Sequence, residues 1–294
     1  MKSHAKPFLK WAGSKKQLVK EIINRVPYKK EEKFTFIEPF LGSGAVLFEM
    51  IKNFPNMNQV IINDINSELI STYIEIRDNV HEVIRKLQEK ADTYFSFSTE
   101  DEKKEYYYQQ RKLFNKRNTS KADHAALFIF LNKTCFNGLY RVNKKNEFNV
   151  PMGKYKNPLI CDDENLKLVS DVLKKVIFLN GDFEKTKEYI SRPTFVYLDP
   201  PYKPITKTSS FTSYSENSFS DDDQLRLQKF CKTISQKGGF WLLSNSDARD
   251  IYGNSFFEEL YKGFKIERVN VKRFINASAE KRGEVKEVLV NNYG

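Results

Sequence analysis

Short apolar runs, each leading into a turn, recur in both halves of the chain and predict buried β-strands. These runs are Phe34–Glu38, Gln59–Ile65, Val176–Asn180, Thr194–Asp199 and Phe240–Asn245. Helical patterns follow the first two runs, at Ala45–Ile51 and from Ser67 onward. Strands that alternate with helices predict an α/β fold with a Rossmann-like, doubly wound parallel sheet. Two late runs, Lys265–Phe274 and Glu284–Tyr293, predict an antiparallel edge.

The segment between these halves differs in composition and in hydrophobic pattern, and it predicts a second domain. It begins with charged helical patterns at Ile74–Lys90 and Glu105–Asn115, and a polar, basic stretch follows from Thr134 to Pro158. Between Leu131 and Ile160 the chain has six Lys or Arg and one Glu, a local balance of +5. We therefore expect a discontinuous domain formed by residues 1–66 and 162–294, with a mainly helical domain, residues 67–161, inserted into it.

Composition narrows the class of protein. The 294 residues carry 49 Lys or Arg against 38 Asp or Glu, and this net charge of +11 favours a polyanionic partner. Three scattered cysteines without a C-x-x-C pair argue against a disulfide framework and a zinc site. The longest apolar run, Ala125–Leu131, is too short to span a bilayer, and no signal peptide is recognisable. We expect a cytoplasmic protein without a membrane partner.

The sequence Asp199–Pro200–Pro201–Tyr202 directly follows the predicted strand TFVYL. Consecutive prolines have a fixed φ and no N–H, so they stiffen the turn and leave carbonyl oxygens as acceptors. The Asp199 carboxylate and the Pro200 carbonyl would accept both N–H bonds of an amino group, while an aromatic ring stacks on Tyr202. Drawing those hydrogens toward two acceptors localises the nitrogen lone pair, which favours methyl transfer to an aromatic amine. The alternative is a proline-stiffened loop with a capping aspartate.

A glycine turn and an acid follow the first two strands and suggest a nucleoside site. Gly42 and Gly44 allow the backbone to approach a ligand closely, although the turn is neither a full dinucleotide fingerprint nor a P-loop. Asp64, at the end of the second strand, would accept hydrogen bonds from ribose hydroxyls. Taken alone, Asp64 is as readily interpreted as the cap of the next helix.

These motifs together resemble one family, the Dam-type (D12 class, group alpha) DNA adenine N6-methyltransferases. The matching segments are FLKWAGSK, EPFLGSG, NDIN, NGLYRVNKKNEFNVPMGKYKNP, GDF and DPPY, in this order. FTSY (Phe211–Tyr214), LSNS (Leu243–Ser246) and the last strand pair also match, so the resemblance extends from Phe8 to Tyr293. One position departs from the family: Ser14 replaces the second glycine of a pair, and a serine with φ > 0 costs about 1 kcal/mol.

The resemblance implies a role for each matching residue. Asp199, Pro200 and Tyr202 would hold the flipped target adenine and form the catalytic set. S-adenosylmethionine would be the methyl donor, without a metal, and the cofactor-binding set would be Trp11, Lys15, Phe40, Gly42, Gly44, Asp64, Asp182, Phe183 and Asp199. The inserted domain would be the target-recognition domain for double-stranded DNA, with GATC as its site. Its DNA-binding set would be Lys10, Phe136, Asn137, Leu139, Arg141, Pro151 and Tyr155.

Physical chemistry independently supports these DNA contacts. An adenine amino group is out of reach inside a stacked duplex, so the base must be extruded and restacked. Arg141 can pair bidentately with O6 and N7 of a guanine, and Leu139 and Pro151 can contact a thymine methyl. Lys144, Lys145, Lys154 and Lys156 suit phosphates, although a single lysine in such a stretch is more often a solvated surface charge.

Other functions remain open at this stage. An adenine methyltransferase acting on RNA uses the same chemistry, whereas the protein glutamine methyltransferases have Asn at the position of Asp199. A non-catalytic DNA-binding protein on the same fold is a rival from a different class, and the intact DPPY motif argues against it. A cognate restriction endonuclease that shares the target site, without direct contact, fits one of two biological roles; the other is solitary methylation.

Overall fold

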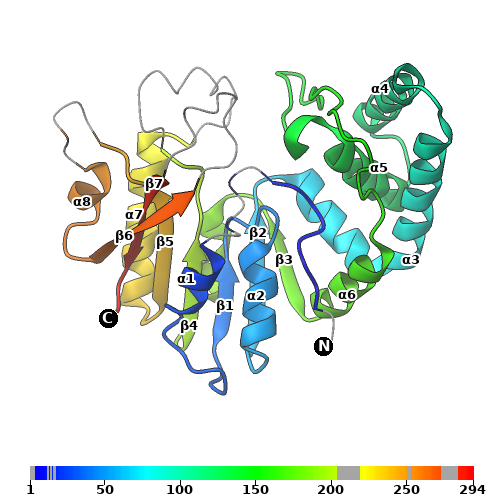
Figure 1. The fold of residues 1–294 in the computed structure, drawn as a ribbon. Coiled ribbons are helices and arrows are strands. Elements are labelled where there is room, and N and C mark those ends of the chain that lie inside the picture. The colour runs from blue at the N-terminus through cyan, green and yellow to red at the C-terminus, as the bar shows by residue number, and fades with distance from the viewer. Residues whose placement is uncertain are drawn as a thin grey trace. The chain divides into compact units, whose positions relative to one another are not determined.

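The structure is a computed structural model that describes residues 4–11, 13, 15, 18–203, 219–249, 253, 255–272 and 284–294. Within these residues, seven strands form one mixed sheet in the order β3-β2-β1-β4-β5-β7-β6 (Figure 1). The strands are β1 (Thr35–Glu38), β2 (Gln59–Asp64), β3 (Val176–Asn180), β4 (Thr194–Leu198), β5 (Phe240–Ser246), β6 (Lys265–Lys272) and β7 (Glu284–Asn291). The predicted α/β class is confirmed.

The register of the central strands explains why they appear as continuous apolar runs. β1 pairs in parallel with β2 and β4, so that Ile37 lies opposite Ile61 on one side and Val196 on the other. β4 pairs in parallel with β5, and every residue of β1 and β4 is buried. Strands covered on both faces show no polar alternation. β7 is antiparallel to both β5 and β6, which confirms the predicted antiparallel edge.

The predicted strand boundaries differ from the observed ones by only one or two residues. β1 begins at Thr35 instead of Phe34, and β2 and β4 each end one residue earlier than expected. β7 ends at Asn291, two residues before the predicted end. The expected end of β6 at Phe274 lies outside the described residues.

Helices connect the strands and make up most of the inserted segment. They are α1 (Val19–Ile23), α2 (Ala45–Asn53), α3 (Ser67–Ser96), α4 (Glu100–Lys116), α5 (Lys121–Thr134), α6 (Asp163–Leu173), α7 (Asp221–Gln236) and α8 (Phe256–Leu260). Two 3-10 turns are η1 (Phe136–Gly138) and η2 (Phe183–Tyr189). α3 has a non-helical residue, Asn79, within it.

The described contacts divide the chain into two compact units. Unit 1 comprises Met1–Ser14, Gly42–Phe48 and Asp64–Gly181; unit 2 comprises Lys15–Leu41, Glu49–Asn63 and Asp182–Gly294. Unit 1 therefore contains all of residues 67–161 together with the N-terminal arm, the glycine turn and β3. The functional boundaries of a target-recognition domain stay a prediction.

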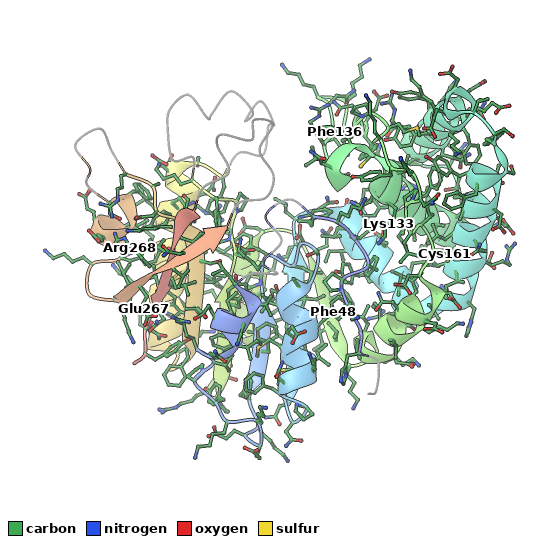
Figure 2. The ribbon with its side chains drawn as sticks, viewed as in Figure 1. Phe48, Lys133, Phe136, Cys161, Glu267 and Arg268 are labelled. Atoms are coloured by element: carbon green, nitrogen blue, oxygen red, sulfur yellow. The ribbon has the colours of Figure 1, made fainter. Side chains whose placement is uncertain are left out.

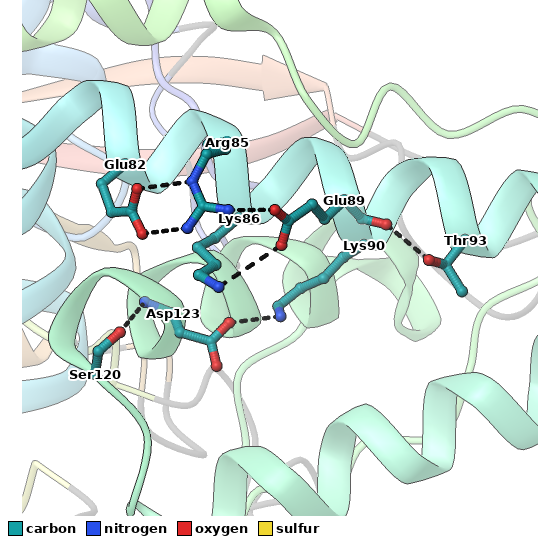
Figure 3. Close-up of polar contacts among 8 residues, drawn as sticks. All are labelled: Glu82, Arg85, Lys86, Glu89, Lys90, Thr93, Ser120 and Asp123. Carbon is teal, nitrogen blue, oxygen red and sulfur yellow. Dashed lines mark hydrogen bonds and ion pairs between the residues drawn. The ribbon is translucent and has the colours of Figure 1, made fainter.

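Unit 1 is built around α5. Ten of the residues of this helix are buried, so the helix lies in the core of the unit. Burial on all sides removes the apolar stripe that would have identified this helix in the sequence. Lys90 on α3 joins the two helices through an ion pair with Asp123, with Nζ and Oδ1 2.6 Å apart (Figure 3). Ser120 caps α5 by accepting the Asp123 N–H.

The outer face of α3 has the charge pattern of a solvated helix. Arg85 pairs with Glu82 and Glu89, and Lys86 lies 3.7 Å from Glu89 (Figure 3). Such exposed i,i+3 and i,i+4 pairs are screened by solvent and contribute little to the free energy of unfolding.

Unit 2 contains the central parallel strands and the antiparallel edge. α7 begins with a capping box in which Ser220 and Asp223 each bond to the other's backbone N–H. Three aspartates, Asp221–Asp223, occupy its first turn, where the helix dipole favours negative charge. The acidic run therefore marks the start of a helix.

Candidate functional site

The predicted site residues fall into both units, and each group is described within its own unit. Unit 2 contains Lys15, Phe40, Asp182, Phe183, Asp199, Pro200 and Tyr202. Unit 1 contains Lys10, Trp11, Gly42, Gly44, Asp64, Phe136, Asn137, Leu139, Arg141, Pro151 and Tyr155. Ser14 and the FTSY segment lie outside the described residues.

Asp199 lies at the carboxyl end of β4 and is held by two donors. Lys15 Nζ is 2.8 Å from Asp199 Oδ1, and the Lys15 side chain is only 7% exposed. The Ser244 hydroxyl donates to the same oxygen at 3.2 Å. Burial raises the pKa of Asp199 above its ordinary value, while Lys15 and Ser244 stabilise the carboxylate and oppose that rise.

Tyr202 is fixed at its hydroxyl, which leaves its ring to present a flat face. The hydroxyl donates to Glu287 Oε2 on β7 at 2.6 Å, and Lys15 Nζ lies 4.0 Å from the ring centroid. Burial raises the pKa of Tyr202 far above its ordinary value, so the hydroxyl stays protonated. Pro200 is buried and Pro201 is exposed. Lys15 thus contacts both the acid and the aromatic residue of the DPPY turn.

Phe40, Asp182 and Phe183 form the second group of unit 2. The Phe40 and Phe183 rings lie 5.6 Å apart, and Phe183 is 3% exposed. Asp182 caps η2 by accepting the Glu184 N–H, and Arg226 of α7 donates to it at 3.0 Å. The group therefore combines an aromatic surface with a carboxylate whose position is fixed by a cation.

In unit 1, the glycine turn and Asp64 are joined by a hydrogen bond. Gly42 has φ +52° and Gly44 φ +69°, a conformation that favours glycine. The Gly42 N–H donates to Asp64 Oδ2 at 3.0 Å, and the Asn66 N–H donates to Oδ1 at 2.9 Å. Burial raises the pKa of Asp64, and these backbone donors oppose the rise.

The cap of α3 is Asn66, whose side chain accepts the Leu69 N–H at 3.1 Å. The alternative role of Asp64 as helix cap is therefore wrong. Its two oxygens instead bind the glycine turn and the backbone after β2, and each retains acceptor capacity because a carboxylate oxygen has two lone pairs.

Trp11 packs directly on the glycine turn of unit 1. A Cβ atom built at Gly42 would lie 3.1 Å from Trp11 Cδ1, so the indole needs a glycine there. The Trp11 ring also stacks on Tyr140, with centroids 5.9 Å apart and planes 14° apart. A larger residue at position 42 would have to displace Trp11 as well as adopt a strained backbone.

Most of the residues of unit 1 that are predicted to bind DNA come from two adjacent backbone segments. Phe136, labelled in Figure 2, is 50% exposed at the start of η1, and its N–H donates to the Pro151 carbonyl at 2.9 Å. Asn137 has φ +53°, and Pro151 is exposed. Leu139, half-buried, follows η1, and its N–H donates to the Phe136 carbonyl. An exposed aromatic ring and an exposed proline are thus held side by side.

Lys10 of the N-terminal arm packs against the same segments. A Cβ at Gly138 would lie 2.3 Å from Lys10 Cβ, so the arm crosses the turn in close contact. Lys10 Nζ donates to the carbonyl of Lys133 (labelled in Figure 2) and lies 3.6 Å from the Tyr155 ring centroid. Burial lowers the pKa of Lys10.

Arg141 is exposed, and its side chain is held by a residue of the same hairpin, residues 141–149, in which Val142 and Phe148 form an antiparallel bridge. Its Nε donates to Asn149 Oδ1 at 2.7 Å, and the Asn149 N–H donates to the Arg141 carbonyl at 3.1 Å. Because Nε donates to Asn149, a bidentate contact with a base would have to use the two terminal nitrogens of the guanidinium. Lys144 and Lys145, at the tip of the hairpin, are exposed.

Sequence reasoning missed residues that act through distant contacts. Asn132 on α5 is 4% exposed and clamps the arm to η1: its side chain bonds to both backbone groups of Lys10 and to the Gly138 carbonyl. Ser244 on β5 was noticed only as part of a motif. Ile65, next to Asp64, is an apolar side chain left 67% exposed. Its exposure could not be read from the sequence, where Ile65 stands at the end of a run that predicts a buried strand.

Two further observations concern the described residues only. No helix among them is both long enough and apolar enough to cross a membrane. They contain no group of three or more His, Cys, Asp or Glu side chains arranged to hold a metal ion.

Comparison with known proteins identifies the family. Residues 11–275 match the model of the D12 class N6 adenine-specific DNA methyltransferases. The chain belongs to this family. A Type II methyltransferase, M.MjaIII, of Methanocaldococcus jannaschii is 48% identical over 293 residues, which cover 98% of this chain and 99% of the relative.

Two other relatives extend over nearly the whole chain as well. M1.LlaDCHI, a Type II methyltransferase of Lactococcus lactis subsp. cremoris, is 39% identical and covers 100% of this chain and 97% of its own length. The DNA adenine methylase of Haemophilus influenzae is 38% identical, with 97% and 92% covered. The D12-class chain is thus an adenine-specific DNA methyltransferase, and DNA is its substrate.

Proposed function

We propose that the chain transfers the methyl group of S-adenosylmethionine to N6 of an adenine that is flipped out of duplex DNA at GATC. The observation that carries this proposal is the DPPY turn at the end of β4, where Asp199 is held by Lys15 and Ser244. The family's reaction requires an acceptor for the N–H bonds of adenine at such a point.

Different residues of this chain would bind the N–H groups and the ring of the target adenine. The Asp199 carboxylate and the Pro200 carbonyl accept the two N–H bonds and orient the lone pair, and the Tyr202 ring stacks on the base. Lys15 and Ser244 keep Asp199 ionised despite its burial. A carboxylate held by such donors before the base arrives needs little reorganisation in the transition state.

The residues proposed for the cofactor fit a nucleoside that carries a positive sulfonium. Asp64 has carboxylate acceptor capacity for ribose hydroxyls, and Gly42 and Gly44 have the positive φ that lets a backbone without side chains approach a ligand closely. Trp11 and Phe40 offer aromatic surface, and Asp182 with Phe183 would hold the adenine ring. When bound, S-adenosylmethionine supplies an electrophilic methyl group; no metal is assigned a role.

The recognition surface of unit 1 supports duplex DNA as the form of the substrate. Phe136 would enter the space left by the flipped base, and Asn137 would face the orphaned partner. Arg141 would read a guanine edge, with Leu139, Pro151, Tyr155 and Lys10 completing the set at GATC. The name DNA adenine methylase, given to the Haemophilus influenzae relative, supports a DNA target.

The relatives named Type II methyltransferases support a place for this chain in a type II restriction–modification system. In such a system the chain and its endonuclease would share a target site without needing to touch each other.

The test is methylation of plasmid DNA followed by digestion. Treated plasmid should resist an endonuclease that cleaves only unmethylated GATC and become sensitive to one that requires methylated adenine there. RNA of the same sequence should accept no labelled methyl group. Methylation outside GATC would overturn the proposed specificity, and methylation of RNA at a comparable rate would overturn the proposed substrate.

A further inference from the structure

The end of β5 is polar although it is buried. Ser244, Asn245 and Ser246 are 0%, 0% and 1% exposed, and together with Leu243 they form the LSNS motif. Burying three polar side chains is costly unless each forms hydrogen bonds. Their partners therefore indicate what this strand end does.

All three side chains bond to the catalytic turn of the same unit. Ser244 Oγ donates to Asp199 Oδ1 at 3.2 Å. Asn245 Oδ1 accepts the Lys203 N–H at 3.1 Å, and Ser246 Oγ donates to the Lys203 carbonyl at 2.6 Å. The strand end thus holds the residue at the start of the DPPY turn and the residue directly after it.

A second hydroxyl lies behind Ser244. Tyr197, on β4 and 0% exposed, has its hydroxyl 2.8 Å from Ser244 Oγ. Ser244 has one proton, and that proton is directed to Asp199, so Tyr197 is the donor in this second bond. Burial raises the pKa of Tyr197 far above its ordinary value, which keeps the donor protonated. The result is a directed chain from Tyr197 through Ser244 to Asp199.

We propose that Ser244, supported by Tyr197, is a positioning residue that fixes the Asp199 carboxylate and holds it in its charged, hydrogen-bond-accepting form. Among the described residues, the polar partners of Asp199 are on Oδ1, so Oδ2 is the oxygen presented to the adenine amino group. This inference rests on the proposed catalytic role of Asp199.

The other charged and titratable groups around Asp199 stay in place when Ser244 is changed. They are Lys15 and Tyr202, which face Asp199 itself, and Glu38 of β1 and Glu287 of β7, whose charges act on Tyr197. Removing the Ser244 donor takes away one of the groups that favour the ionised carboxylate, so the pKa of Asp199 rises. Because the carboxylate form is the acceptor, activity should then be lost at a higher pH as the solution is acidified.

The experiment measures the single-turnover methylation rate against pH at saturating DNA and cofactor. In Ser244→Ala the acidic limb of the profile should move upward by about one pH unit, the size expected when a hydrogen bond to a charged group is lost. Ser244→Thr, which keeps the hydroxyl, should restore the wild-type limb. Tyr197→Phe should move the limb in the same direction by less. The double variant should match Ser244→Ala, because Tyr197 acts only through Ser244.

Ser235→Ala is the matched control. Ser235 accepts the Trp241 indole N–H at 2.9 Å near the other end of β5, so its loss removes a hydroxyl from the same strand's environment but not from the turn. This variant should leave the acidic limb unchanged even if its midpoint of thermal unfolding falls. If Ser244→Ala does not fold, Tyr197→Phe, which loses a single oxygen, provides the test.

An unshifted limb in folded Ser244→Ala, or additive shifts in the double variant, would overturn the inference. These failures are distinguishable from failure of the proposed function. Substantial turnover in Asp199→Ala would remove the proposed role of Asp199 itself. An inactive Asp199→Ala together with an unshifted Ser244→Ala would refute only the positioning role of Ser244.

Discussion

The end of β4 in unit 2 and the hairpin of residues 141–149 in unit 1, which we propose reads the DNA (the recognition hairpin), hold their charged side chains in opposite ways. Asp199 follows a fully buried strand and has bonds to an ammonium and a hydroxyl. Arg141 and Lys144 are exposed, and the Arg141 side chain donates from its Nε to Asn149. In the first region, neighbouring protein groups set the pKa and the position of the carboxylate. In the second, the cations are exposed and available to the proposed DNA ligand.

The difference predicts two kinds of failure. A change at a buried, partnered charge alters chemistry or local binding geometry, because the surrounding protein groups were arranged for that charge. A change at an exposed cation should alter only the affinity or the sequence specificity of DNA binding. Variants in the two regions should therefore separate the rate of methyl transfer from the affinity and specificity for DNA.

The largest effect is expected for Asp199→Ala. The loss of one of two acceptors at the reacting nitrogen should lower the single-turnover rate by about 10²–10³-fold. Binding of duplex DNA, measured by fluorescence anisotropy, should stay close to wild type. Asp171→Ala, which removes an exposed carboxylate paired with Lys174 on unit 1, is the control and should keep full activity.

The same residue sets the sign of the pH dependence. Burial raises the pKa of Asp199 above the ordinary 3.8, and the ionised form is the acceptor. Activity should therefore fall as the pH falls through this raised value and be complete above it. A rate that stays constant below that range, or an Asp199→Ala variant with more than a tenth of wild-type turnover, contradicts the assignment.

The next effect is on cofactor affinity. Asp64→Ala removes the carboxylate proposed for the ribose hydroxyls, and S-adenosylmethionine binding should weaken by about 1–3 kcal/mol. Asp64 belongs to unit 1 yet is partly buried and bonded to backbone donors. This variant therefore tests whether the surroundings of a charge, and not the unit that contains it, decide the kind of failure. Calorimetry on the folded variant is the measurement, with exposed Asp163→Ala as control. Unchanged affinity would leave Asp64 with a purely structural role in the turn.

The sequence predicted the central sheet well because its strands are buried on both faces. β4 was recognised to within one residue from its run TFVYL, and β3 was recognised at both ends. α5 was missed as a helix because it is buried all round and shows no amphipathic stripe. The apolar run Ala125–Leu131 did not distinguish a buried helix from a buried strand.

The candidate site was predictable where residues are adjacent in the chain and not where the fold brings them together. The DPPY turn is contiguous, so its chemistry could be inferred from its letters. Ser244 meets Asp199 across 45 positions, and Asn132 meets Lys10 across 122. Nothing local in the sequence encodes these contacts, because pairing of β4 with β5 and packing of the arm on α5 create them.

Within the recognition hairpin, Arg141→Ala should affect specificity. A bidentate contact with a guanine edge is worth about 1–3 kcal/mol of discrimination at one base pair. Activity on the near-cognate site that differs at that pair should rise relative to GATC, while single-turnover rates at saturating DNA change little. Arg85→Ala is the matched control, since Arg85 is an exposed arginine paired with glutamates on α3. Equal losses on GATC and all its variants would make Arg141 a phosphate contact.

The smallest effect is expected for Lys144→Ala, and it tests whether the hairpin's two cations differ. Lys144 is exposed at the hairpin tip, where a phosphate contact would release about one counterion. Its loss should weaken binding to all sequences alike and lower the slope of log affinity against log salt by about one. Lys167→Ala, at a lysine paired with Asp163 on α6, should leave that slope unchanged. A merely basic surface would give this uniform, salt-dependent loss at Arg141 as well. Arg141 and Lys144 have distinct roles only if discrimination changes in the first variant and the salt slope alone changes in the second.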